Sequence, residues 1–587
     1  MGFLWLIAAL MVFLLIKGIY DKKKAKERLV KRLSEEWGTL PEEEYSEAKF
    51  RSLQYYYDNC YQGKEQIDFL LDSITWNDLN LNELFFMLNN TGSAMGEEIL
   101  WAILHDLKCS ETELLFRNKL ISFFENNCDA RLKLQTSFSL IGKNKKISVY
   151  EYMDRMEQVR RESNVIHYFG IFGIVISVIL LCCSVAYAGL FLIGFIIFNL
   201  ISYYKRKGEI EAYYSVISYL ISMLKYADKI AKDDIPELDD ILQIIKKNTL
   251  ELRGFCKGAP AVTPQNATGD MLSVFIDYFR IVFHSDLIRF NNMMKHYFDK
   301  KALIVEVFEA VGLLDAMCSV ASFRTMLGSY CIPKFIANKQ FDTEGLYHPY
   351  LEKPVPADIS TTKSVLITGS NASGKSTFIK SAAINAIMAQ TIYTVCAKNY
   401  KSSFFKVYTS MALTDNLFGN ESYYIVEIKS LKRILDASQG GIPVLCFVDE
   451  VLRGTNTVER IAASSRILHS IANSNALMFA ATHDIELTYM LENSFTNFHF
   501  EEQISEDAIT FDYQLKEGRA TTQNAISLLG MLGYPEDIIQ KARQTAACFI
   551  NEGEWQNCTI SSGSVRISSG RTIGINCNFH KSPPYIL

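Results

Sequence analysis

The sequence predicts an α/β domain carboxyl-terminal to a long α-helical region, with three transmembrane helices in the amino-terminal half of the chain. From about residue 341 onward, short β-branched runs alternate with helical stretches, which is the pattern of an α/β sheet. Through residues 205–340, apolar residues recur at helical spacing. Two long apolar stretches, at residues 2–20 and 165–204, have the composition of membrane spans.

The overall composition fits a large chain with several domains and little charge bias. The chain has 587 residues, of which 49% are hydrophobic, and a net charge of −5. This balance excludes a polybasic nucleic-acid binder by composition, but it is compatible with a local basic groove. The 13 cysteines form no CxxC pair, and Cys182 and Cys183 lie inside an apolar run. We therefore expect reduced thiols rather than disulfides or a zinc site.

The first apolar stretch, Gly2–Tyr20, predicts a transmembrane anchor. It has about the length that a helix needs to cross a bilayer, and Lys17 can extend to the interface. The basic cluster DKKKAKERLVKR follows the stretch, whereas in a cleaved signal peptide the basic residues come first. Positive charge next to the span predicts that the body of the chain lies in the cytoplasm.

The second stretch, Val165–Tyr204, predicts a two-helix membrane hairpin. It contains no charged residue, is about twice as long as one span and has basic residues on both sides. A tight turn near Ala186–Gly189 keeps both ends on the cytoplasmic side. Together with the anchor, this gives three spans in an inner or cytoplasmic membrane.

We predict seven segments along the chain. They are an anchor (1–20), a charged juxtamembrane helical linker (21–79), a first helical core part (80–162), the membrane hairpin (163–204), a second helical core and lever part (205–340), the α/β domain (341–550) and a tail (551–587). The tail is rich in Ser, Gly and Asn, which is typical of a poorly ordered segment or a short appendage.

A phosphate-binding loop stands at the start of the α/β domain. Residues 369–376, GSNASGKS, fit the pattern G-x(4)-G-K-[ST], between the strand-like SVLIT and the helix-like STFIKSAAINAIMAQ. In such a loop, backbone N–H groups and a helix N-terminus surround the phosphates of ATP, while the Lys reaches the β- and γ-phosphates and the Ser hydroxyl binds Mg²⁺. The predicted nucleotide-binding residues are Gly369, Ser370, Asn371, Ala372, Ser373, Gly374, Lys375, Ser376 and Thr377.

Two later strands end in residues suited to phosphate chemistry. VLCFVDE ends in Asp449, which can hold Mg²⁺ with Ser376, and in Glu450, which can orient or deprotonate water. ALMFAATHD ends near His483, at a position suited to sensing the γ-phosphate. The predicted catalytic residues are therefore Lys375, Glu450 and His483.

These motifs together resemble the ATPase domain of the MutS family of DNA mismatch-repair proteins. TGSNASGKST, VDEVLRGTNT and ATHDIEL occur in the family's order and spacing, and YHPYL is similar to the entry to that domain. Thr414–Ile428 resembles the family's signature segment, and residues 513–543 resemble its helix-turn-helix-like end. The resemblance covers residues 341–547, and a looser one covers residues 80–150.

The resemblance implies an ABC-type P-loop ATPase that works as a homodimer. In such a dimer, Ser422 of one copy would reach the γ-phosphate bound by the other, Glu450 would activate water and His483 would act as the switch. Arg453, Gly454 and Thr455 would lie at the dimer face. ATP binding with Mg²⁺ would close the dimer and move helical arms that hold DNA.

The chain also departs from the family pattern. The family's Phe-x-Glu mismatch-reading wedge has no counterpart, so we expect the amino-terminal recognition domain to be missing. Asn420 replaces the usual Gly of the signature segment, and the apolar hairpin interrupts the helical region. These departures leave the ATPase motifs intact and weaken the case for mismatch recognition.

Three functions remain open on the sequence alone. The first is a membrane-anchored MutS-like ATPase acting on mismatched or branched DNA, with DNA and a second copy as partners. The second is an ABC-type membrane ATPase for transport or remodelling, against which stands the lack of an LSGGQ-like signature. The third is a membrane scaffold that does not act on DNA, against which stands the complete set of Lys375, Asp449, Glu450 and His483.

Overall fold

A computed structural model describes most of the chain. The described residues are 2–42, 45–64, 67–143, 148–160, 162–256, 280–370, 373–411, 423–504, 509–520, 526, 529 and 533–552. The chain divides into two compact units, Met1–Gln503 with Thr510–Thr521 and Ile504–Ile509 with Thr522–Leu587. The helical region and the larger sheets all belong to the first unit. These boundaries are not those of the seven predicted segments, which stay predictions.

The amino-terminal region is helical, as the apolar spacing predicts. Its helices are α1 (Gly2–Glu35), α2 (Glu47–Asn59), α3 (Ser73–Asp78), α4 (Leu81–Leu88), α5 (Ala94–His105), α6 (Glu111–Asn126), α7 (Cys128–Ile141), α8 (Val149–Met156), α9 (Val165–Cys182), α10 (Ala188–Ile230), α11 (Asp239–Glu251), α12 (Arg253–Cys256) and α14 (Ser285–Leu327). A short antiparallel pair, β1 (Phe69–Leu70) with β2 (Asp106–Leu107), lies among them.

The centre of the helical region is the packing of α14 on α5. Every residue of α5 is buried. The two helices approach closely at Gly312, where an added Cβ would lie 2.7 Å from Ile99 Cγ1 and 2.9 Å from the Met95 carbonyl oxygen. Asp315 accepts hydrogen bonds from the backbone N–H groups of Gly92 (3.0 Å) and Ser93 (2.8 Å), so α14 also holds the turn that precedes α5.

The carboxyl-terminal part contains two larger sheets, in agreement with the predicted α/β pattern. The six-stranded sheet has the order β14 (Lys516–Glu517), β11 (Phe495–His499), β6 (Ser364–Thr368), β10 (Ala476–Ala481), β9 (Val444–Asp449) and β8 (Lys406–Ser410). All its pairs are parallel except β14 with β11. The four-stranded sheet has the order β3 (Lys334–Phe335), β7 (Asn399–Ser402), β4 (Phe341–Leu346) and β5 (Ala357–Thr361). A separate pair joins β12 (Glu502–Ile504) and β13 (Ile509–Phe511).

Helices cover both faces of the six-stranded sheet, because its central strands are apolar on both sides. Leu445 and Phe447 of β9 belong to the core that includes α15 (Lys375–Thr391). The alternate residues Val444, Cys446 and Val448 belong to a second core. That second core also contains residues of α16 (Tyr423–Ala437), α17 (Thr457–Ala472) and α18 (Ile485–Met490). Helix α20 (Glu536–Glu552) belongs to the second unit.

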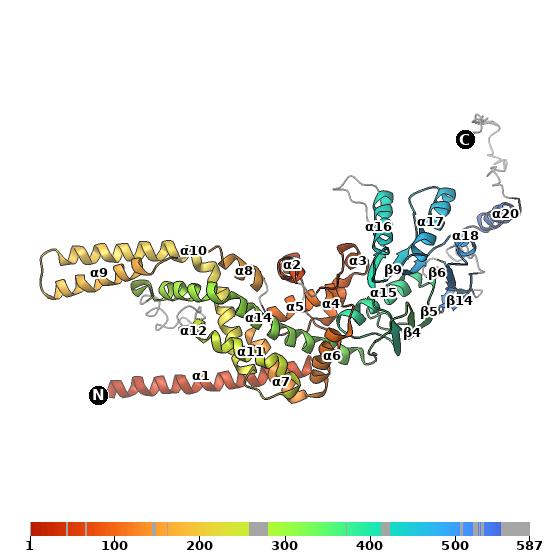
Figure 1. The fold of residues 1–587 in the computed structure, drawn as a ribbon. Coiled ribbons are helices and arrows are strands. Elements are labelled where there is room, and N and C mark those ends of the chain that lie inside the picture. The colour runs from red at the N-terminus through yellow and green to blue at the C-terminus, as the bar shows by residue number, and fades with distance from the viewer. Residues whose placement is uncertain are drawn as a thin grey trace, which may run out of the picture. The chain divides into compact units, whose positions relative to one another are not determined.

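Helix α15 is buried between the sheet and the helical region. All its residues from Ser381 to Thr391 are buried, and it contacts β8, β9 and β10 as well as α5 and β2 (Figure 1). Two fully buried arginines bind the backbone at its carboxyl end. Arg117 of α6 donates to the Thr391 carbonyl oxygen (2.5 Å), and Arg324 of α14 donates to the Tyr393 carbonyl oxygen (2.9 Å). Cations at a helix carboxyl end satisfy its free carbonyl groups and interact favourably with its dipole.

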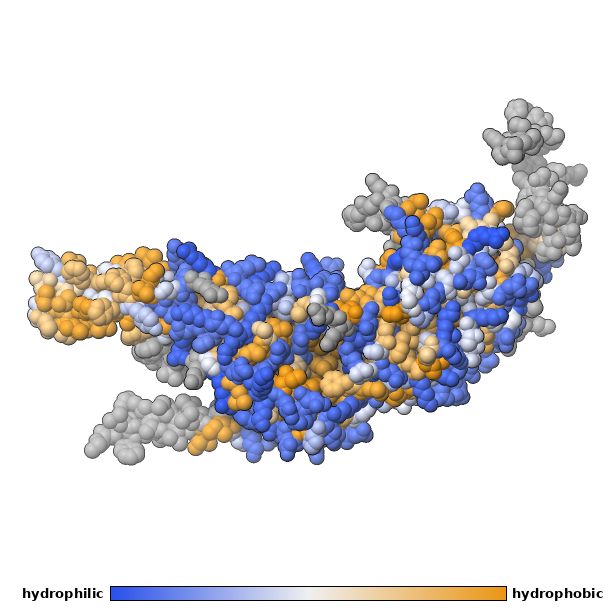
Figure 2. All heavy atoms as spheres, in the orientation of Figure 1, coloured by the Kyte–Doolittle hydropathy of each residue, from blue (hydrophilic) through white to orange (hydrophobic). Residues whose placement is uncertain are grey.

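Helices α9 and α10 form the predicted hairpin and lie side by side (Figure 1). Gly170 and Gly173 permit the close approach, because an added Cβ would lie 1.9 Å from Asn199 Oδ1 and 2.1 Å from Phe195 Cε1, respectively. The other sides of both helices are exposed and apolar, which gives the hydrophobic surface seen in Figure 2. Helix α10 continues without a break from this hairpin into the buried core of the helical region, as far as Ile230.

The structure supports two of the three predicted membrane spans. Among the described residues, two helices are long and apolar enough to cross a membrane, Val165–Cys182 and Ala188–Glu211, rather than the three predicted. The predicted first span falls in α1, which is helical, but the side chains of residues 2–12, 14 and 15 lie outside the described part. The anchor at residues 1–20 therefore stays a prediction.

A buried carboxyl group leads to a prediction about pH. Glu98 of α5 is buried and accepts a hydrogen bond from the Val149 N–H (3.1 Å), and burial raises its pKa from 4.5 to about 8. The folded state thus binds a proton more tightly than the unfolded chain, so Glu98 makes the free energy of unfolding fall as the pH rises from about 4.5 to about 8. When the pH is raised from 5 to 8, the melting temperature of the wild type should fall more than that of Glu98→Gln, by about 2 °C or more. Equal falls in the melting temperatures of the wild type and Glu98→Gln would contradict this prediction. So would an exposed control variant, Glu237→Gln, that differs from the wild type as much as Glu98→Gln does.

Candidate nucleotide-binding site

The predicted phosphate loop joins strand β6 to helix α15, at the carboxyl edge of the parallel strands. Two of its glycines have backbone conformations that favour glycine, with φ of +149° at Gly369 and +108° at Gly374. A Cβ on Gly369 would lie 2.8 Å from Ser373 Oγ and 2.9 Å from the Phe500 carbonyl oxygen. The tight path of the loop therefore requires glycine at this position.

Lys375 lies over the loop rather than in solvent. Its side chain is buried, and Nζ donates to the carbonyl oxygens of Gly369 and Ser370, both at 2.7 Å. These contacts place the ammonium charge beside the loop, at the first residue of α15. The next two residues, Ser376 and Thr377, are exposed in the first turn, and the predicted loop residues Asn371 and Ala372 lie outside the described part.

Asp449 is placed to hold a cation. It ends β9, which pairs with β10, and β10 pairs with β6, the strand that leads into the loop. Its Oδ1 atom is buried and accepts no hydrogen bond from any described residue. A buried carboxylate oxygen without a donor is costly unless a cation or an ordered water occupies the place. Asp449 and the exposed hydroxyl of Ser376 are thus oxygen ligands of the kind that Mg²⁺ uses beside phosphates.

The structure brings Glu450 and His483 together. Glu450 has a left-handed backbone (φ +55°), and its N–H donates to the Ala481 carbonyl oxygen of β10 (3.0 Å). This turn places Glu450 Oε1 3.0 Å from His483 Nε2. The other carboxylate oxygen forms an ion pair with Arg453 Nε. The two predicted catalytic side chains therefore lie in direct contact at the ends of adjacent strands.

Helix α16 holds the segment that follows Glu450. The buried carboxylate of Glu427 accepts a hydrogen bond from the Leu452 N–H, and burial raises the pKa of this carboxyl above its ordinary value. Gly454 packs against Tyr424, since an added Cβ would lie 3.0 Å from Tyr424 Cβ. Glu427 and Tyr424 belong to the signature segment found in the sequence, whereas Ser422 and the rest of residues 412–422 lie outside the described part.

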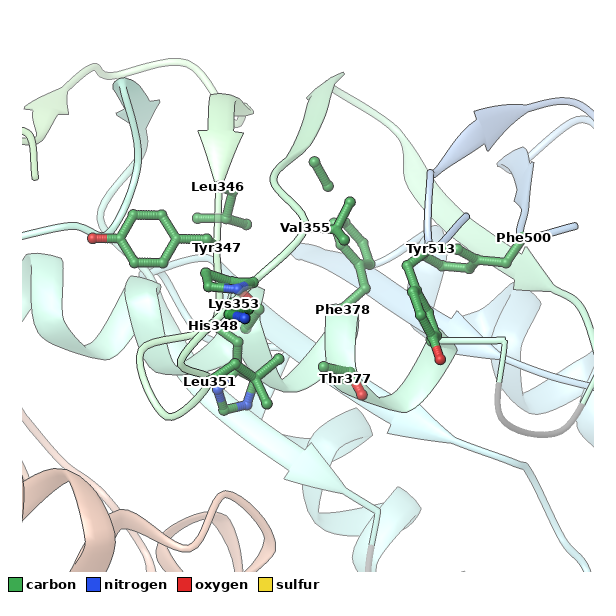
Figure 3. A pocket seen from close by; sticks show the side chains of 14 residues that line it. Leu346, Tyr347, His348, Leu351, Lys353, Val355, Thr377, Phe378, Phe500 and Tyr513 are labelled. Carbon is green, nitrogen blue, oxygen red and sulfur yellow. The ribbon is translucent and has the colours of Figure 1, made fainter. Parts of the chain in front are cut away.

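A cavity of about 330 Å³ opens beside the loop (Figure 3). It lies between the first turns of α15 and the segment joining β4 to β5, with two aromatic residues from the segments near β11 and β14. Its volume and its mixed aromatic and polar lining suit a planar base next to bound phosphates. Burial lowers the pKa of His348 to about 4, which keeps its imidazole neutral. The lining residues are Leu346, Tyr347, His348, Leu351, Lys353, Pro354, Val355, Ala357, Gly374, Thr377, Phe378, Ser381, Phe500 and Tyr513.

Sequence reasoning missed most of this cavity. It singled out His348 only as part of the YHPYL segment, and it gave no role to Phe500 or Tyr513. Tyr513 packs against the phosphate loop, because a Cβ added to Gly374 would lie 3.2 Å from Tyr513 Cδ1. A single sequence does not reveal such a contact between residues that are far apart in the chain.

A comparison with known protein families finds one family whose profile matches the part of the chain that contains this site. Residues 365–549 match the family profile of MutS domain V. This part of the chain is a MutS-family domain. The matched segment contains the phosphate loop, Asp449, Glu450 and His483, as the resemblance predicted.

Curated relatives carry the names of DNA mismatch-repair proteins. The MutS protein of Natronomonas pharaonis is 32% identical over 267 residues, which is 43% of this chain and 30% of that protein. The MutS protein of a Thermus thermophilus strain is 28% identical over 236 residues, 39% of this chain and 28% of that protein. The MSH3 protein of Phaeosphaeria nodorum is 30% identical over 249 residues, 40% of this chain and 22% of that protein. The chain thus spans less than a third of the length of each relative.

The conformation of the loop predicts that adding a methyl group at Gly369 lowers its stability and its affinity for ATP. Gly369→Ala should destabilise the folded loop by about 1–2 kcal/mol, because of its positive φ and the close contacts of a Cβ. It should also weaken binding of ATP by about tenfold or more, as measured by isothermal titration calorimetry. Gly441→Ala is the matched control, since an added Cβ there meets nothing within 4 Å. Unchanged ATP affinity in Gly369→Ala would contradict the placement of phosphate in this loop.

Proposed function

We propose that this chain is a membrane-anchored, MutS-like ATPase that acts on DNA. The observation that carries the proposal is the group formed by Glu450 and His483 beside the buried, unpartnered oxygen of Asp449, at the strand edge next to the phosphate loop. The match of the same residues to MutS domain V supports it.

Each residue of the site would have a separate role in ATP hydrolysis. The loop and Lys375 would bind the phosphates, and Ser376 and Asp449 would hold Mg²⁺, which neutralises phosphate charge when bound. Glu450 would accept the proton of the attacking water, in an orientation held by its contact with His483. The cavity lined by Phe378, Phe500 and Tyr513 would hold the adenine base.

The active form that we propose is a homodimer of ATPase domains. Apolar side chains are exposed on the two helices that flank the Glu450 segment, with Ile425 of α16 43% exposed and Val458 of α17 79% exposed. A second copy would cover such residues and bring its Ser422 to the γ-phosphate. Dimer closure with ATP would then move the helical region, which is the part proposed to contact mismatched or branched DNA.

The hairpin of α9 and α10 would place this ATPase at an inner or cytoplasmic membrane. Its exposed apolar surface supports insertion, and its basic flanks support a cytoplasmic ATPase domain. The anchor at residues 1–20 would add a third span.

A second candidate is an ATPase that remodels the membrane without acting on DNA. The continuity of α10 favours it, because one uninterrupted helix joins the hairpin to the buried core. A rigid connection of this kind would transmit movement of the helical region directly to the membrane segment.

The full chain in detergent or lipid nanodiscs tests these proposals. Mg²⁺-dependent ATP hydrolysis should be measurable, and Glu450→Gln should lower its rate by about 100-fold or more while ATP still binds. Lys375→Ala should weaken ATP binding itself. Glu237→Gln, an exposed glutamate of the helical region, is the matched control and should keep full activity.

The DNA arms of the same assay separate the two candidates. Hydrolysis should rise with mismatched or branched DNA relative to a matched duplex if the chain acts on DNA. If none of the DNAs changes the rate of ATP hydrolysis and none binds, the result would favour the membrane-remodelling ATPase. Full activity in Glu450→Gln would contradict the proposed site itself.

A further inference from the structure

A second cavity, of about 540 Å³, lies in the helical region and shares no lining residue with the cavity beside the phosphate loop. It is enclosed by α2, β1, α3 and α5. Its lining residues are Phe50, Gln54, Tyr57, Asp58, Gln62, Leu70, Leu71, Asp72, Ser73, Trp76, Asn77, Asn82, Trp101 and His105. Its volume lies within the range of small-molecule sites, about 300–1,000 Å³.

Stacked aromatic rings form the apolar wall of this cavity. Trp76 stacks on His105, with ring centroids 3.7 Å apart and an angle of 9° between the planes. Trp101 lies against Trp76 (4.8 Å) and Phe50 (5.8 Å), and Tyr57 lies against His105 (4.3 Å). Flat, ordered rings of this kind offer stacking surfaces to a planar ligand.

The same wall carries a hydrogen-bond donor without an acceptor. Trp101 is 4% exposed, and its indole Nε1 atom is buried and has no hydrogen-bond partner among the described residues. The neighbouring Trp76 Nε1, in contrast, donates to Asn82 Oδ1 (2.9 Å). A buried indole N–H without an acceptor is costly in a protein interior, and a ligand acceptor in the cavity would satisfy it.

His105 adds an acceptor next to this donor. Its Nδ1 lies 2.8 Å from the Trp101 carbonyl oxygen and must donate to it, because a carbonyl oxygen only accepts. Burial lowers the pKa of His105 to about 3, so the ring is neutral and Nε2 carries a lone pair. The wall therefore presents an N–H donor and a nitrogen acceptor on rings whose centroids are 5.1 Å apart.

The charge of the rim limits the ligand further. The cavity has no Lys or Arg among its lining residues, whereas Asp58 and Asp72 stand at its edge. Asp72 also forms an ion pair with Arg433 of α16 (2.7 Å), which holds its side chain in place. Because the lining has two carboxylates and no Lys or Arg, it offers a phosphate no cationic partner, so a nucleotide is a poor fit here.

We propose that this cavity binds an uncharged, planar heteroaromatic molecule of the nucleobase or nucleoside class, without phosphate. The base would stack against the aromatic wall, accept a hydrogen bond from Trp101 Nε1 and donate one to His105 Nε2. The sugar hydroxyls would face the amides and carboxylates of the rim, such as Gln54 and Asp58. This site is independent of the proposed hydrolysis of ATP.

Isothermal titration calorimetry of the full chain with adenosine, guanosine, cytidine and uridine tests the proposal. At least one nucleoside should bind with a Kd below about 1 mM. Trp101→Phe should weaken that binding by about tenfold, since it keeps an aromatic side chain but removes the indole N–H. Because the phenyl ring is smaller than the buried indole, the melting temperature is measured for the same variant to separate lost binding from lost folded protein. Trp37→Phe is the matched control, since Trp37 packs against Arg131 and lies outside the cavity.

A second variant covers the case in which Trp101→Phe disturbs the fold. Gln54 is exposed at the rim, so Gln54→Trp should close the cavity and abolish the binding without a change in the core. Binding of none of the four nucleosides would overturn the proposal, and so would equal affinity in the wild type, Trp101→Phe and Gln54→Trp. Binding of choline instead of any nucleoside would assign the cavity to organic cations and overturn the ligand class.

Discussion

The burial of helix α15 between the sheet and the helical region is the constraint on which the rest of the structure depends. Its first residue, Lys375, lies over the phosphate loop. Its last residue, Thr391, is bound by Arg117, and Tyr393 just after the helix is bound by Arg324; both arginines are 1% exposed. A buried guanidinium is stable only when its donors are all used, so neither arginine tolerates a shift of the helix end. The position of the loop is therefore fixed by helices that are distant in the sequence.

A second set of contacts fixes the site from the opposite face of the sheet. Helix α16 uses the buried carboxylate of Glu427 to hold the backbone at Leu452, just after Glu450. Glu450 keeps a left-handed backbone there, a conformation that persists only when its surroundings enforce it. The same helix reaches the helical region through Arg433 and Asp72. The phosphate loop and the Glu450–His483 group are thus each tied to the helical region, by different helices.

The sequence predicted the parts of this arrangement that are local. A strand, a glycine loop and a helix N-terminus follow one another directly in the chain, so the nucleotide loop was predicted from its motif. Asp449, Glu450 and His483 were predicted from their strand ends together with the loop and the resemblance to the MutS family. Arg117 and Arg324 were not found, because a charged residue on a helix gives no sign that it will be buried against a distant helix end. The apolar length of residues 165–204 predicted the hairpin, while the continuation of α10 past its basic flank was missed, since helical spacing alone does not tell where one helix ends. The cavities depend on residues far apart in the chain, such as Trp101 with Phe50 and Gly374 with Tyr513, which a single sequence does not pair.

Hydrogen–deuterium exchange of the full chain with and without Mg²⁺ and ATP tests most directly whether α15 connects the phosphate loop to the helical region. ATP should change the amide exchange of the end of α14, around residues 317–327, in the wild type. Arg324→Met should still bind ATP at the loop but lose this response, because the contact between α14 and the end of α15 is gone. A response of α14 that persists unchanged in Arg324→Met, or none in the wild type despite bound ATP, would contradict the connection.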